Sequence, residues 1–311
     1  EFPEELIASA PAEPRDNSRL MVVDRASGKA DHRTFKDLPD FMESGDCLVL
    51  NKTKVFSCRL LGKKSTGGKA DLLLVREIEP GLWGALASGF KPGMTLHFPA
   101  DLTAVVESLN SEGEYLCRFN RADIMTYLEG HGLAPLPPYI LKRKKVESSD
   151  QSRYQTVYAQ HAGSIAAPTA GLHFTQALLA RVRDKGVRSA EVTLHVGRGT
   201  FRPIQTDDAS AHQMLPEWYR MESADAAVVR ETMARGKKVF SVGTTTTRTL
   251  ETLAQSGLDG GEGWTKLYIT PGHSFKAISA LVTNFHLPRS TPLMLASAFL
   301  GREKLLAVYR E

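Results

Sequence analysis

The stretch at residues 238–255, KVFSVGTTTTRTLETLAQ, carries the pattern that decides the fold. Its first five residues are mostly apolar and predict a buried strand, which ends at Gly243. The pattern from Thr246 to Gln255 predicts a helix. Strands that alternate with helices need crossover connections, so this unit predicts a mostly parallel sheet with helices on both faces.

The same alternation extends over the rest of the second half of the chain. We expect helices over 175–185, 223–235, 291–299 and 302–310, and strands over 188–196, 266–270 and 281–284. Near the start, a strand over 20–24, a short helix after Asp37 and a strand over 47–50 are expected. Residues 1–56 and 152–311 are therefore predicted to form one α/β domain, with its site at the carboxyl ends of the strands.

Residues 57–119 have a different sequence pattern, in which short β-prone runs are separated by turns such as Gly67-Gly68 and Pro92-Gly93. The expected strands are 59–62, 70–75, 83–86, 95–98, 103–106 and 115–119. This spacing is typical of a small barrel or sandwich. We predict an inserted small β-barrel domain over 57–151, with an exit helix at 121–129 and a proline-containing, basic linker over 136–145.

Composition sets the broad class. The chain has 311 residues, 42% of them hydrophobic, and a net charge of +4, which does not by itself indicate nucleic-acid binding. No apolar run approaches the roughly 18 residues of a membrane span, and the acidic start lacks a signal-peptide pattern, so we expect a cytoplasmic protein. Cys47, Cys58 and Cys117 lie far apart in apolar stretches, which favours core thiols over disulfides or metal ligands.

Four segments that follow the predicted strands combine Gly, Thr, His and Arg. They are residues 167–175, 195–203, 243–248 and 283–288. Glycine allows a ligand to approach the backbone, and a Gly-Thr-Thr turn that opens a helix offers N–H groups and hydroxyls to an anion. Each segment taken singly is also explained by helix capping or by a structural histidine. Four of them at one sheet edge favour a functional site.

In this order, the segments resemble those of the S-adenosylmethionine:tRNA ribosyltransferase-isomerase family of queuosine biosynthesis. The resemblance extends through further strings along nearly the whole chain: 6–25, 48–60, LPPYI at 136–140, RYQTVYA at 153–159, EWY at 217–219, GW at 263–264 and AF at 298–299. It implies a larger α/β domain of parallel-sheet type into which a β-barrel is inserted.

The resemblance also implies a reaction. The family moves the ribosyl part of S-adenosylmethionine to 7-aminomethyl-7-deazaguanine at the tRNA wobble position and rearranges it to epoxyqueuosine. Adenine and methionine are released, so S-adenosylmethionine is a consumed ribosyl donor and no true cofactor is implied. The expected partners are tRNA and S-adenosylmethionine, without membrane or metal, and a monomer is expected.

This chemistry suggests roles for particular residues. A base that removes the C5′ proton would give a sulfonium ylide, and an acid would help adenine leave. The candidates for catalysis are His173, His195, His286 and Arg248, and their order is left open. The candidates for binding S-adenosylmethionine are Thr169, Gly171, Gly197, Gly199, Thr200, Gly243, Thr244, Thr245 and Asn284. Gly243, Thr244 and Thr245 would suit the methionine carboxylate, and Arg248 that carboxylate or an RNA phosphate.

A basic run is the candidate for holding the anticodon arm of tRNA. It comprises Lys142, Arg143, Lys144 and Lys145, and Arg153 and Arg202 are grouped with it. The functional interpretation is contact with backbone phosphates. The alternative is an ordinary solvated charge run.

Several positions depart from the family pattern. Lys52 and Lys54 stand where the family usually has Asp and Arg, Leu215 replaces a usual His, and Ser279 replaces a usual Asp. The segment 86–92 also looks short. These departures keep a divergent paralogue as an alternative.

Two other classes of protein compete with this interpretation. A metal-dependent hydrolase would use His173, His195, His212 and His286 with Glu217, but no common metal-ligand spacing is present. A non-catalytic RNA-binding module would explain the basic run, Tyr139 and Tyr154, but it would not need the Gly, Thr and His segments.

Overall fold

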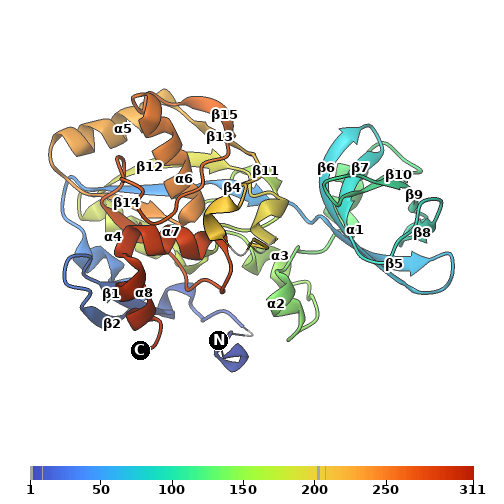
Figure 1. Cartoon of the computed structure of the whole chain (residues 1–311), viewed down its shortest axis with the longest axis horizontal. Helices are drawn as coiled ribbons and strands as arrows, with labels where there is room; N and C mark the ends of the chain where they lie inside the picture. The colour runs from blue at the N-terminus through green and yellow to red at the C-terminus, as the bar shows by residue number, and fades with distance from the viewer. Residues whose placement is uncertain (1–2, 9, 202–203, 207) are drawn as a thin grey trace. The chain divides into compact units, whose positions relative to one another are not determined.

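The computed structural model describes residues 3–8, 10–201, 204–206 and 208–311. The chain divides into two compact units (Figure 1). Unit 1 comprises Glu1–Lys54 and Gln155–Glu311, and unit 2 comprises Val55–Tyr154. No helix in the described ranges is both long and apolar enough to span a membrane.

Unit 1 is built on a six-stranded mixed sheet. In spatial order its strands are β15 (Gly261–Thr265), β13 (Glu217–Met221), β12 (Arg188–Leu194), β3 (Cys47–Asn51), β14 (Val239–Val242) and β16 (Ala280–Val282). β12, β3, β14 and β16 pair in parallel, whereas β13 and β15 add an antiparallel edge. The predicted mostly parallel α/β sheet is confirmed.

Helices cover both faces of this sheet. On one face, α4 (Gln176–Asp184) and η3 (Phe35–Phe41) pack on alternate strand residues such as Leu48 and Leu50. On the other face, α5 (Ser223–Ala234) and α6 (Thr244–Leu253) pack on Cys47 and Val49. Figure 1 shows α5 and α4 on opposite sides of the sheet. The continuous apolar run of β3 is explained because both of its faces are buried.

Shorter elements complete unit 1. They are β1 (Arg19–Val23) with β2 (Ala30–Thr34), β4 (Thr53–Val55) with β11 (His161–Ser164), α7 (Thr291–Leu300), α8 (Arg302–Val308), η1 (Glu4–Leu6), η2 (Arg15–Asn17), η4 (Thr169–His173), η5 (Arg198–Phe201), η6 (Ala209–Ala211) and η7 (Ala254–Ser256).

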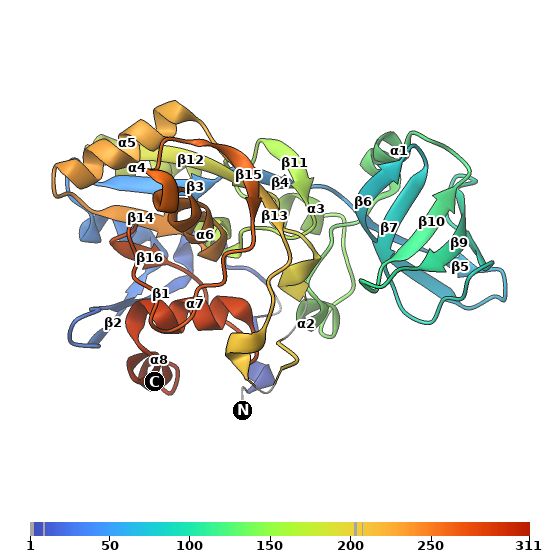
Figure 2. The same cartoon turned by 45° about the horizontal axis from the view of Figure 1, so that its top comes forward.

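Unit 2 is a closed six-stranded antiparallel barrel (Figure 2). Its strands are β5 (Arg59–Lys64), β6 (Lys69–Glu79), β7 (Leu82–Leu86), β8 (Thr95–His97), β9 (Thr103–Leu109) and β10 (Tyr115–Phe119). Alternate residues of β6, such as Leu72 and Leu74, are fully buried and fill the barrel. The helices α1 (Ile124–His131), α2 (Pro138–Leu141) and α3 (Asp150–Arg153) follow the strands. The predicted barrel and its six strands are confirmed.

Some details of the sequence prediction are wrong. The strand expected over 266–270 lies earlier, as β15, whose two glycines hide its β pattern. The expected linker over 136–145 begins with the short helix α2, because Pro138 occupies its first turn. The short strands β2, β4, β11 and β13 went unpredicted.

The three cysteines are free and buried, as predicted. Burial raises the pKa of the Cys47 thiol and of the Cys117 thiol to about 12, and it raises the pKa of Cys58 as well. The thiols are therefore uncharged at neutral pH.

Candidate functional site

The candidate site lies at the carboxyl ends of the parallel strands of unit 1. β12, β3, β14 and β16 end at Leu194, Asn51, Val242 and Val282, so the segments that follow them leave the same edge of the sheet. In open α/β sheets this edge is where ligands bind. Three of the four segments singled out in the sequence begin here.

The N-terminus of α6 forms one part of the site. Gly243 links β14 to this helix with a φ of 87°, a left-handed conformation that favours glycine. Thr244, Thr245 and Thr246 are the first three helical residues, and N–H groups at that position have no acceptor within the helix. The predicted anion site at Gly243, Thr244 and Thr245 thus has suitable donors, and its occupant stays a prediction.

Asn51 connects the ends of the central strands. Its side-chain amide Nδ2 donates to the Leu194 carbonyl and to Thr245 Oγ1, each at 3.1 Å. Its Oδ1 accepts from the N–H groups of Thr53 and Leu194, also at 3.1 Å. Asn51 is fully buried and was not predicted from the sequence, although a polar residue at the end of a buried strand was the available clue.

A chain of hydroxyl groups holds His195. The Val196 N–H donates to Ser164 Oγ at 2.8 Å, Ser164 Oγ lies 2.7 Å from Thr53 Oγ1, and Thr53 Oγ1 lies 2.9 Å from His195 Nδ1. The His195 ring also stacks on Trp218, with centroids 5.0 Å apart. Gly163 lies so close to the ring that a Cβ there would come within 2.7 Å of Nε2.

This chain of hydrogen bonds defines the tautomer of His195. Ser164 and Thr53 are both fully buried, so each hydroxyl proton needs an acceptor. If Ser164 donates to Thr53 and Thr53 donates to His195 Nδ1, each hydroxyl proton has an acceptor. If His195 Nδ1 instead donates to Thr53 and Thr53 to Ser164, no described residue is placed to accept the Ser164 proton. We infer that neutral His195 carries its proton on Nε2 and presents a donor there.

His173 is held in the opposite tautomer. Ser18 Oγ donates to the Arg15 carbonyl and therefore accepts from His173 Nδ1 at 3.0 Å. His173 Nε2 accepts from Asn284 Nδ2 at 3.0 Å, which joins η4 to the segment after β16. Asn284 Oδ1 is buried and accepts no hydrogen bond from the described residues. Burial, and then the nearby Arg15 charge, lower the pKa of His173.

His286 lies in the segment that follows β16. The ring nitrogen Nε2 of His286 lies 2.7 Å from Thr283 Oγ1. The backbone N–H of His286 donates to the Tyr309 hydroxyl at 2.8 Å. Burial lowers the pKa of His286 from 6.5 to about 4. Burial also lowers the pKa of His195, so all three histidines favour the neutral form.

The low pKa of His286 predicts a stability change with pH. Between pH 6.5 and about 4, the unfolded chain binds a proton at His286 that the folded chain does not, so stability falls as pH falls through this window. Replacing His286→Gln should remove about 1–2 kcal/mol of the loss between pH 7.5 and 5. Urea unfolding of both proteins at the two pH values measures the difference. An equal loss in both proteins would show that His286 titrates normally.

Arg248 faces inward from α6. It forms an ion pair with Glu217 of β13, and its Nε donates to the Leu267 carbonyl at 3.0 Å. Glu217 also accepts from the Gly197 N–H at 2.9 Å, and both charged side chains are more than nine-tenths buried. Arg248 thus binds other parts of the protein and holds the 195–200 segment through Glu217, which the sequence had suggested only as a metal ligand.

The other predicted binding residues have mixed surroundings. A Cβ at Gly171 would lie 2.0 Å from the Tyr158 hydroxyl, so packing requires glycine there. Thr169 is half-buried at the start of η4, and Gly199 packs beside Leu215. Arg202 and the side chain of Thr200 lie outside the described residues. Roles in binding stay predictions for all of them.

Two of the unusual positions have defined partners. Lys52 Nζ donates to Glu191 Oε2 at 3.0 Å, so the positive charge found where the family usually has Asp is matched by a carboxylate. Ser279 Oγ accepts from the Val239 N–H at 3.1 Å beside β14. Lys54 is exposed.

The basic run lies in unit 2, after α2. Lys144 pairs with Asp150 at 2.8 Å, whereas Lys142, Arg143 and Lys145 are exposed. Arg153 ends α3. Exposure suits phosphate contact and ordinary solvation equally, so RNA binding by this run stays a prediction.

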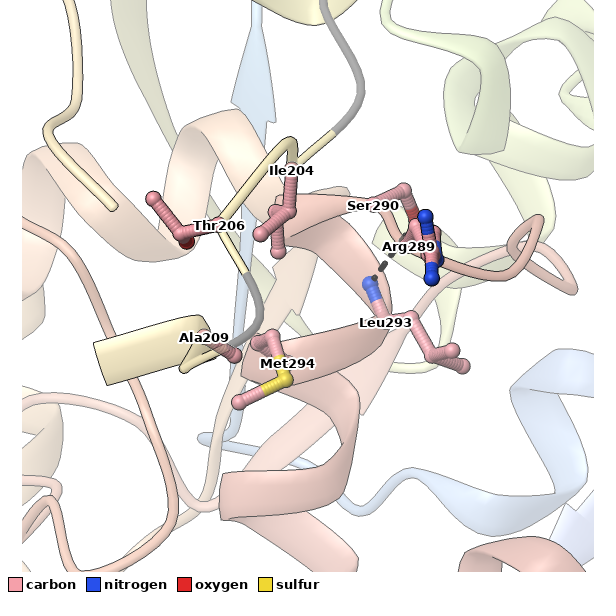
Figure 3. Close-up of a pocket in the computed structure, with 7 residues that line it drawn as sticks. All are labelled: Ile204, Thr206, Ala209, Arg289, Ser290, Leu293 and Met294. Atoms are coloured by element: carbon pink, nitrogen blue, oxygen red, sulfur yellow. Dashed lines mark hydrogen bonds between the residues drawn. The ribbon is translucent and has the colours of Figure 1, made fainter. Parts of the chain in front are cut away.

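A cavity of about 170 Å³ opens between the segment after β12 and the start of α7 (Figure 3). Its lining residues are Ile204, Thr206, Ala209, Arg289, Ser290, Leu293 and Met294. Figure 3 shows Ile204 and Met294 from the two segments on facing sides, and the Ile204 N–H donates to the Arg289 carbonyl at 2.8 Å. The cavity is below the usual range of about 300–1,000 Å³ for small-molecule pockets.

In the part of the chain that the structure describes, no three His, Cys, Asp or Glu side chains gather so as to hold a metal ion.

Comparison with known proteins gives a consistent result. A family model described as queuosine biosynthesis protein matches residues 1–311. A protein named S-adenosylmethionine:tRNA ribosyltransferase-isomerase, from a strain of Anaeromyxobacter dehalogenans, is 49% identical over 319 residues, which cover 100% of this chain and 92% of that relative. One of the same name from Acetivibrio thermocellus is 45% identical, over 99% of this chain and 92% of its own length.

A solved structure agrees with these relatives. The crystal structure of S-adenosylmethionine tRNA ribosyltransferase from Thermotoga maritima matches with a TM-score of 0.55 and 36% identity, over 100% of this chain and 92% of that one. The family resemblance stated from the sequence is confirmed. Because the family model spans the whole chain and relatives match it at nearly half of the aligned positions, this chain belongs to the queuosine biosynthesis protein family.

Proposed function

We propose that this chain is an S-adenosylmethionine:tRNA ribosyltransferase-isomerase. It would move the ribosyl group of S-adenosylmethionine to 7-aminomethyl-7-deazaguanine at the tRNA wobble position, form epoxyqueuosine, and release adenine and methionine. The full-length relatives of that name support the activity. The observation that carries the proposal within this chain is the pair of neutral histidines held in opposite tautomers at one sheet edge.

The two histidines match a proton acceptor and a hydrogen-bond donor that the reaction can use. Removal of the C5′ proton requires an acceptor, and His173 Nε2 is one once substrate displaces the Asn284 amide. Departure of adenine is helped by a hydrogen bond to the leaving nitrogen, which the Nε2–H of neutral His195 would donate. Both rings are neutral and differ in which nitrogen carries the proton, so one presents an acceptor and the other a donor.

Some of the remaining site residues would bind S-adenosylmethionine directly, and others would support the site without touching it. The methionine carboxylate would bind the N–H groups at the start of α6, with Gly243, Thr244 and Thr245. Thr169, Gly197, Gly199, Thr200 and Asn284 are the candidates for the ribose and adenine. Arg248 would act through Glu217, which fixes the Gly197 N–H, and not by direct contact. Gly171 would act by packing.

Adenine release is the direct test. The protein is incubated with S-adenosylmethionine labelled in the adenine and with tRNA that carries the 7-aminomethyl-7-deazaguanine precursor. We expect adenine release that depends on this tRNA and survives a chelator. Binding of tRNA without release would favour a non-catalytic binder, and chelator-sensitive hydrolysis a metal-dependent hydrolase.

The exposed basic residues give a separate prediction for tRNA binding. Replacing Lys142, Arg143 and Lys145 by Ser leaves the Lys144–Asp150 ion pair intact. For each phosphate that the variant no longer neutralises, the slope of log affinity against log salt should fall by roughly 0.7–0.9. Affinity for S-adenosylmethionine should not change. The slopes are measured by titrating tRNA at several salt concentrations.

A matched control removes exposed charge elsewhere in unit 2. Replacing Lys63, Lys69 and Lys91 by Ser takes three exposed lysines from the barrel. We expect the wild-type slope in this control. If the basic-run variant also keeps the wild-type slope, the tRNA phosphates bind elsewhere.

A further inference from the structure

We propose that His195, Trp218 and Trp264 form a stacking row that binds an unpaired base of the RNA substrate. This inference rests on the proposed function and adds a base-binding surface to it. The three residues come from the end of β12, from β13 and from the edge strand β15. None of the charged residues considered above for RNA binding takes part.

Strand register places the three side chains in a row. Trp218 pairs directly with Trp264 across β13 and β15. On the other side, Leu194 pairs with Tyr219, and the His195 N–H donates to the Trp218 carbonyl at 3.0 Å, so His195 lies opposite Trp218. Residues directly opposite each other in antiparallel strands project from the same face of the sheet. The rings of His195 and Trp218 are stacked, with an interplanar angle of 21°.

This row lies on the face of the sheet edge opposite α5 and α6. The neighbours of Trp218 along β13 point to the other face, where Glu217 meets Arg248 of α6 and Met221 joins the core under α5 and α6. Trp218 is half-buried, and Trp264 is 68% exposed. Figure 2 shows β13 and β15 side by side at this edge. The paired positions thus lead from His195, which stacks on Trp218, to the exposed Trp264 on the edge strand.

The chemistry of the row favours a nucleobase as its occupant. Flat aromatic side chains bind unpaired RNA bases by stacking, without regard to sequence. A phosphate is disfavoured because the nearest cation along β13, Arg220, already lies 2.8 Å from Glu222 and 3.9 Å from Glu262. The proposed reaction acts on a base of the anticodon loop, so its unpaired neighbours would meet the row beside His195.

The test is RNA binding rather than turnover. An anticodon stem-loop RNA is titrated against the full chain and against Trp264→Ala and Trp264→Tyr. Loss of one stacked base should weaken binding about tenfold in the Ala variant, and the Tyr variant should retain most of the affinity. Because stacking neutralises no phosphate, the Ala variant should keep the wild-type salt slope. Met233→Ala, which trims an exposed apolar residue on α5, is the matched control and should bind normally.

The possible outcomes separate this inference from the function on which it rests. If the wild-type protein binds no RNA, the proposed function fails. If the wild type binds and Trp264→Ala binds equally well, or binds with a lower salt slope, the stacking row is wrong. If instead Trp264→Ala abolishes self-association measured by sedimentation and leaves RNA binding unchanged, Trp264 serves contact between copies of the chain, which also overturns the inference.

Discussion

Replacement of His195 by Ala is expected to slow adenine release by roughly 10²-fold or more, the usual effect of losing a positioned hydrogen-bond donor that stabilises developing charge. The structure gives a reason to expect this effect at His195, since its Nε2 is a donor and its other nitrogen is held by Thr53. His173→Ala should have a comparable effect, because it removes the acceptor. Single-turnover assays with labelled S-adenosylmethionine measure the step, and circular dichroism checks that the variants fold.

Thr53 provides the control for this interpretation. Thr53→Ser keeps the hydroxyl that donates to His195 Nδ1, whereas Thr53→Val removes it at nearly constant volume. We expect near wild-type release in the Ser variant and a marked loss in the Val variant. Nitrogen-15 shifts of His195 should report a proton on Nε2 in the wild type and a mixture of tautomers in Thr53→Val. Unchanged rates in His173→Ala, His195→Ala and His286→Ala would show that all three histidines are structural.

Loss of Glu217 alone is expected to destabilise the protein by about 3–5 kcal/mol. In Glu217→Leu, the Arg248 guanidinium stays buried without its carboxylate, and the Gly197 N–H loses its acceptor. In the double variant Glu217→Leu with Arg248→Met, no unpaired charge remains, so much of the stability should return. Urea unfolding at pH 7.5 gives the free energies.

An exposed ion pair is the comparison for this prediction. Arg230 and Asp259 lie 2.9 Å apart, and their side chains are 41% and 77% exposed. Removing Asp259 should change stability by at most about 1 kcal/mol. A loss this small in Glu217→Leu would mean that water reaches Arg248 in the folded protein.

The sequence predicted secondary structure best in the segments whose hydrophobic pattern reflects burial. Much of the barrel strands β6 and β9 alternates buried and more exposed residues, and β3 and β14 are mostly apolar and buried throughout, so their patterns were unambiguous. β15 escaped prediction because it is an edge strand with the sequence GEGWT, in which pairing with β13, not propensity, determines the conformation. α6 begins two residues earlier than predicted, because Gly243 adopts the turn conformation that allows its start.

The sequence predicted which loops form the candidate site, but it did not predict which residues hydrogen-bond to the site histidines. Gly, Thr and His after strands indicated the sheet edge, whereas Ser18 lies 155 residues from its partner His173 and Thr53 lies 142 residues from His195. Neither Ser nor Thr stands out locally, since both are common in turns. The inward direction of Arg248 was equally hidden, because it depends on a carboxylate in another strand.

The burial of Cys47, Cys58 and Cys117 has a practical consequence for studying this protein. Alkylating reagents attack the thiolate, and burial keeps all three native thiols protonated and covered in the folded chain. A single cysteine introduced on the surface, for example Met233→Cys on α5, would therefore carry a fluorophore or spin label selectively without deletion of the native cysteines. Labelled in this way in unit 1 and at an exposed barrel position such as Lys69→Cys, the enzyme would report by energy transfer the distance between the two labels with and without RNA.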